Sequence, residues 1–125
     1  MLEQELNEFG RRMGLPGLSF SPDGLAALDV ERMGRLHLEK GGKPGAEELL
    51  VYLARPCPAH DRKAPERALA LCHYRHPRPF PLSAGMHGDQ LIMLTRLQER
   101  EVTAANLEKT ALFLADAMNN VIQGA

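Results

Sequence analysis

The sequence predicts an α+β fold in which three helices pack against a five-stranded, antiparallel, twisted sheet, in the order α-β-β-β-α-β-β-α. Three observations predict it. Apolar residues recur at helical spacing at both ends of the chain, they alternate with polar residues in between, and Gly- and Pro-rich loops separate these runs. A chain of 125 residues without an internal repeat fits one core. We therefore treat residues 1–125 as a single domain.

The chain opens with an amphipathic helix. Its apolar residues Leu2, Leu6, Phe9 and Met13 follow helical spacing, and charged residues occupy the other faces. Acidic residues lead and arginines trail, which suits the helix dipole. The pair Gly14 and Pro16 predicts the end of this helix.

Three strands should follow. Ala26, Leu28 and Val30 alternate with polar or small residues, and Leu36 and Leu38 repeat the pattern after a short connection at 32–34. The glycine-rich segment 41–45 predicts a loop, and the third strand is expected over 48–55.

The second half predicts two helices and two strands. A middle helix is expected over 64–74, with Pro65 permitted in its first turn. The prolines of 76–81 forbid a helix there and predict an extended segment leading to a strand at 82–86. After a turn, 90–97 predicts the fifth strand. Thr103 can cap the last helix, whose apolar stripe runs to Ile122.

Composition excludes several classes of function. Sixteen acidic and fifteen basic residues give a net charge of -1 without clustered lysines and arginines, which argues against nucleic acid as a partner. The amino-terminal residues lack the features of a signal peptide, and apolar runs are too short to cross a membrane. We expect a cytoplasmic protein without membrane association, and cysteines in the reduced state.

The predicted strands carry more apolar faces than three helices can cover. The third strand has Leu49, Val51 and Leu53 on one face but Leu50 and Tyr52 on the other, and the fifth strand repeats this pattern. Exposed apolar patches usually mark interfaces, so a partner subunit, a client segment or both are expected. Tight packing within one subunit is the alternative interpretation.

A metal site or an enzyme is the competing hypothesis. Cys57, His60, Cys72 and His76 offer thiol and imidazole groups at spacings that a tetrahedral zinc site could use. Against it, Cys72 fits a small buried residue on the middle helix, and Cys57 lies between two prolines. The serines and cysteines lie in no nucleophile motif, and the glycine loop lacks P-loop spacing. We expect no catalytic residue, no metal ligand and no cofactor.

Several segments, taken in order, resemble the class I chaperones of bacterial type III secretion. They are the opening and final helices together with residues Leu28–Val30, Leu36–Glu39, Leu50–Arg55, Pro81–Gly85 and Gln90–Leu94. Within that family the sequence is most similar to the SycN type, which serves the gatekeeper protein of the secretion channel. The resemblance spans nearly the whole chain.

The resemblance implies a dimeric chaperone that binds the extended amino-terminal segment of a secreted effector or gatekeeper protein and keeps it export-competent. The partner subunit would be a second copy or another small chaperone. The implied dimer interface combines the middle helix and the next strand, at Ala68, Leu69, Leu71, Cys72, Leu82, Ala84 and Met86. The implied client-binding positions are Leu2, Leu6, Phe9, Met13, Leu36, Leu38, Leu50 and Tyr52.

Overall fold

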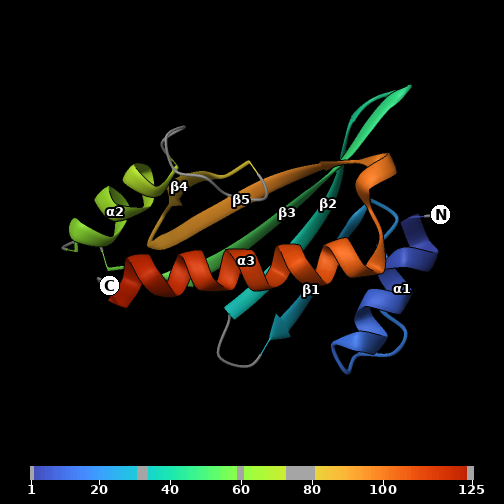
Figure 1. Cartoon of the computed structure of the whole chain (residues 1–125), viewed down its shortest axis with the longest axis horizontal. Helices are drawn as coiled ribbons and strands as arrows, with labels where there is room; N and C mark the ends of the chain where they lie inside the picture. Colours follow the sequence, from blue (N-terminus) through green and yellow to red (C-terminus); the bar gives the residue numbers. More distant parts are fainter. Residues whose placement is uncertain (1, 31–33, 59–60, 73–80, 124–125) are drawn as a thin grey trace.

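The computed structural model describes residues 2–30, 34–58, 61–72 and 81–123. Figure 1 shows helix α3 lying across the sheet, with α1 and α2 near opposite ends of it. The predicted order of helices and strands is confirmed, with one short 3-10 helix in addition. The elements are α1 (Leu2–Arg12), β1 (Leu25–Val30), β2 (Gly34–Lys43), β3 (Ala46–Pro56), α2 (Lys63–Leu71), β4 (Ser83–His87), β5 (Gln90–Gln98), η1 (Glu99–Glu101) and α3 (Ala104–Gln123).

The sheet has the order β1-β2-β3-β5-β4, and every neighbouring pair is antiparallel. Strands β3 and β5 therefore lie at the centre, whereas β1 and β4 form the edges. Directly paired residues point to the same face of a sheet. Tyr52 pairs with Leu94, and Leu53 pairs with Met93, so β3 and β5 carry one apolar set on each face.

One face of the sheet forms the core with the helices. Leu49, Val51 and Leu53 of β3 have exposed fractions of 0, 0 and 1%, and α3 packs Leu114 and Met118 against this side, both at 0%. Burial of each such large apolar side chain contributes about 1.5–3 kcal/mol. Both α1 and α2 also contact α3, so the helices share one face of the sheet.

The β2–β3 hairpin corrects the prediction of a five-residue loop. Gly41, Gly42 and Lys43 continue β2 and pair with β3, leaving only Pro44 and Gly45 as the turn. Proline followed by a glycine with φ 85° fits a type II turn. The sequence contained this turn signal, but the two preceding glycines concealed the strand. In Figure 1 the green tip of this hairpin extends beyond the helices.

The helix ends agree with the sequence except in the middle helix. The first helix ends at Arg12, and Gly14 with φ 83° follows it. The middle helix ends at Leu71 with Cys72 as its C-cap, three residues before the expected end at Tyr74. Residues 73–80, and with them most of the expected extended segment, lie outside the described residues.

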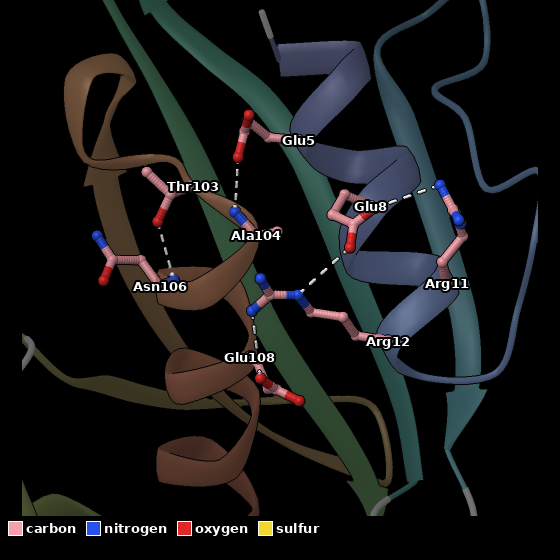
Figure 2. A network of polar contacts seen from close by, with 8 residues as sticks. All are labelled: Glu5, Glu8, Arg11, Arg12, Thr103, Ala104, Asn106 and Glu108. Atoms are coloured by element: carbon pink, nitrogen blue, oxygen red, sulfur yellow. Dashed lines mark hydrogen bonds and ion pairs between the residues drawn. The ribbon is translucent and has the colours of Figure 1, made fainter.

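Polar contacts join α1 to the start of α3 (Figure 2). The Glu5 carboxylate accepts a hydrogen bond of 2.8 Å from the Ala104 backbone amide, and the Thr103 hydroxyl accepts one of 3.0 Å from the Asn106 amide. The amides of the first helical turn have no partners within their own helix, so both contacts stabilise this end. Thr103 thus caps α3 as predicted.

Candidate interaction surface

The second face of the sheet is apolar, and no helix in the described ranges covers it. We call this surface the open face. Its hollow centre is lined by His37 and Glu39 of β2, Leu50, Tyr52 and Ala54 of β3, His87 of β4, and Gln90, Ile92 and Leu94 of β5. Apolar side chains of β3 and β5 occupy the middle, and polar groups lie at the sides. Such a patch is typical of a protein-binding surface.

Two stacked rings stand on the open face. His37 and Tyr52 pair directly across β2 and β3, with ring centroids 4.7 Å apart and an angle of 5° between planes. Partial burial and the charge of Arg35 lower the pKa of His37, and partial burial raises the pKa of Tyr52. Both shifts favour the neutral side chain, so the pair offers an uncharged aromatic surface near neutral pH.

Two arginines on the open face each pair with a carboxylate. Arg35 makes hydrogen bonds of 3.0 and 3.1 Å to the two carboxylate oxygens of Asp29 across β1 and β2. Arg96 approaches Glu48 at 3.9 Å. Both arginines are well exposed, so these pairs add little to stability and mainly fix the charge pattern around the hollow.

The first helix does not present the stripe that the sequence suggested. Leu6 and Phe9 are 1 and 0% exposed and belong to the core, so the prediction that they contact a client is corrected for this structure. Leu2 and Met13 are half-buried and pack at the margin of the core. Helical spacing identified the correct face of the helix, but that face packs against the chain itself.

The predicted sheet positions divide in the same way. Leu36 and Leu38 are 2 and 1% exposed on the core face, so they too are corrected to core residues. Leu50 and Tyr52 lie on the open face, as a client-binding role would require. Sequence reasoning did not select Ile92 and Leu94, which line the same hollow. Their alternation with Leu91 and Met93 was the signal that could have identified them.

A second hollow lies where the start of α1 meets the hairpin tip and η1. Leu2 and Val102 line it together with Glu5, Glu47 and Glu99. Its lining contains several carboxylates, and Glu5 is already used to cap α3. The open face is therefore the better candidate for binding an apolar segment.

The predicted dimer interface forms a partly exposed surface along α2 and β4. Leu69 and Met86 have exposed fractions of 63 and 43%, and Leu71, Cys72 and Ala84 are half-buried. Ala68 and Leu82 are 0 and 6% exposed inside the subunit, so we correct these two to core residues. The remaining five positions stay a prediction.

The structure gives no support to a zinc site in the part that it describes. Cys57 is 2% exposed, and burial and the charge of Asp61 raise the pKa of its thiol, which disfavours the thiolate that a metal requires. Among the described residues, no three His, Cys, Asp or Glu side chains gather in a metal-binding arrangement. His60 and His76, two of the four proposed ligands, lie outside the described residues.

None of the helices within the described ranges combines the length and the apolar character needed to span a bilayer.

Comparison with known proteins decides the family. The family described as type III secretory system chaperone SycN matches residues 1–122, almost the entire chain. The chain belongs to this SycN family. The family assignment agrees with the resemblance drawn from the strand and helix segments. A search of curated proteins found no match to this SycN-family chain.

Solved structures show the same fold. The chaperone SycH from Yersinia pestis, solved with a stable fragment of YscM2, aligns with this SycN-family chain at a TM-score of 0.74 and 14% identity, covering 97% of this chain and 99% of that one. A chain of the HopA1–SchA chaperone–effector complex gives 0.71 and 15%, covering 96 and 91%. A chain of the ExsC–ExsE complex gives 0.71 and 20%, covering 97 and 91%.

Proposed function

We propose that this type III secretion chaperone binds an extended amino-terminal segment of a secreted effector or gatekeeper protein on its open face and keeps that segment export-competent in the cytoplasm. The observation that carries the proposal is the uncovered apolar surface around Tyr52, Ile92 and Leu94, on a face that no described helix covers. Two of the structural neighbours were solved with a chaperone's protein partner, a YscM2 fragment and an effector. Holding a segment in this way requires apolar contacts and no reactive group, so we propose a non-enzymatic role without a cofactor.

We further propose that the functional unit is a dimer formed through α2 and β4. Leu69 of α2 and Met86 of the edge strand β4 are large apolar side chains exposed on this surface, and the outer side of β4 pairs with no described strand. Exposed apolar residues beside a free strand edge favour association with a second subunit. The partner is either a second copy of this chain or a different small chaperone, and mass determination separates the two.

The proposal is tested by co-purification from the native cell with a tagged wild-type chain and a Tyr52→Asp variant, followed by light-scattering mass determination. A charge in the middle of the open face should remove the secreted protein but leave the dimer intact. The control is Leu112→Asp, because Leu112 is 51% exposed on the outer side of α3. Recovery of the same secreted protein with the Tyr52→Asp variant would contradict binding at the open face.

A further inference from the structure

Glu39 lies at the side of the open face, within reach of its aromatic centre. It is half-buried, pairs directly with Leu50 across β2 and β3, and stands two residues from His37 on the same side of β2. It also lines the hollow with Tyr52. Glu39 therefore brings a carboxylate to the edge of the apolar and aromatic centre of the open face.

The other carboxylates described on this face already have basic partners. Asp29 is bound by Arg35 at 3.0 Å, and Glu48 approaches Arg96 at 3.9 Å. In the described part of the chain, Glu39 has no Lys, Arg or His nitrogen within the 4.0 Å that defines an ion pair. Its charge is thus available to a group that arrives from outside.

The charge of Glu39 acts on both stacked rings. It contributes to the raised pKa of Tyr52, and it opposes the lowering of the pKa of His37. Along the strands Glu39 stands two residues from His37 and opposite Leu50, which is two residues from Tyr52, so its carboxylate can stabilise positive charge over the two rings. Aromatic faces themselves attract cations, and the attraction grows as water is excluded.

We propose that the open face selects partner segments in which a Lys or Arg side chain accompanies the apolar residues, with its cationic group pairing with Glu39 and its stem lying on the His37–Tyr52 rings. An Arg side chain fits best because its planar guanidinium can stack on the rings and donate hydrogen bonds to a carboxylate. This inference names the chemistry of the client segment, so it rests on the proposed function.

The test uses the amino-terminal segment of the secreted protein that co-purifies in the experiment above, fluorescently labelled, and the full-length chaperone. Binding is measured for wild type, Glu39→Gln and the control Asp116→Asn, whose carboxylate is exposed on α3. Each Lys and Arg of the segment is also replaced in turn by Gln. Loss of the Glu39 charge should weaken binding about tenfold. One of these replacements in the segment should weaken its binding to wild type by the same factor and leave its binding to Glu39→Gln unchanged.

A charge exchange provides the second readout. Glu39→Lys should bind the native segment more weakly than Glu39→Gln, and a Glu placed at the critical basic position of the segment should restore its binding. Equal affinities of wild type, Glu39→Gln and Asp116→Asn for the native segment would overturn the inference but leave the proposed function standing. A segment that fails to bind wild type, or that binds Tyr52→Asp equally well, would overturn both.

Discussion

The rings of His37 and Tyr52 lie parallel at 4.7 Å on neighbouring strands, on the side of the sheet opposite the core. Stacking fixes both side chains before a partner arrives, so little conformational entropy remains to be lost there on binding. Because His37 can take up a proton, the same pair also makes this surface responsive to pH.

The stability of the chain should depend on pH through His37. Partial burial and the charge of Arg35 hold its pKa below the ordinary value of 6.5, so the unfolded chain binds this proton more readily than the folded chain. The contribution of neutral His37 to the stability of the folded chain is fully present above its pKa in the unfolded chain. This contribution is lost as the pH falls through its lower pKa in the folded chain. Urea unfolding from about pH 7.5 to about pH 5 should show a weaker loss of stability for His37→Gln than for wild type. Identical pH profiles would contradict this account.

The dimer proposal predicts that Leu69→Glu and Met86→Glu each shift the chain toward monomer. Both side chains are mostly outside the core, so the substitutions place a charge on the proposed interface without opening a cavity. Leu112→Glu changes a leucine on α3 whose exposed fraction of 51% lies between those of Leu69 and Met86, and it should leave the mass unchanged. Sedimentation equilibrium measures all three. A dimer that survives both α2 and β4 substitutions places the interface elsewhere.

The fold should tolerate a side chain at Gly41 but not at Gly42. Gly42 has φ 85°, and an added Cβ would collide with the Ala46 carbonyl oxygen, whereas a Cβ at Gly41 has ordinary contacts at 4.0 Å. Positive φ alone costs a non-glycine residue about 1–2 kcal/mol. Gly42→Ala should therefore destabilise the chain by at least that amount in urea unfolding, and Gly41→Ala should stay within about 0.5 kcal/mol of wild type. Equal losses of stability in Gly41→Ala and Gly42→Ala would contradict the backbone conformation described for this hairpin.

Removing one buried hydroxyl should stabilise the core. Thr95 is 1% exposed, and its hydroxyl has no hydrogen-bond partner among the described residues, so Thr95→Val should raise the free energy of unfolding by about 1 kcal/mol. Thr110 is equally buried but donates a hydrogen bond of 2.7 Å to the Asn106 carbonyl. Thr110→Val should therefore not stabilise the chain. Thermal unfolding of the two variants compares them, and a loss of stability in Thr95→Val would indicate a partner for that hydroxyl.

Local sequence patterns predicted the elements well, because period and end signals depend on nearby residues. Gly14 and Thr103 set helix ends, as the structure confirms. The continuation of β2 through Gly41 and Gly42 was not predicted, because glycine has a low preference for strands. Pairing with Glu48 and Glu47 across the hairpin keeps these two glycines in the strand.

Which apolar residues face a partner could not be read from the sequence in the same way. Alternation separates Leu38 from His37 but does not say which of the two strand faces the helices will cover. The helical stripe of Leu6 and Phe9 looked equally suited to a client and to the core, and only the packing of α1 beside α3 places it in the core. The pairing of Tyr52 with Leu94 depends on strands far apart in the sequence.

The most direct test of client binding at the open face is photo-crosslinking in the native cell with a photoreactive phenylalanine at position 52 or, as control, at position 112. Tyr52 is an aromatic residue at the centre of the open face, and Leu112 is exposed on α3. We expect a crosslink to the amino-terminal segment of a secreted protein from position 52 and none from position 112. A client that co-purifies but crosslinks only from position 112 would contradict it.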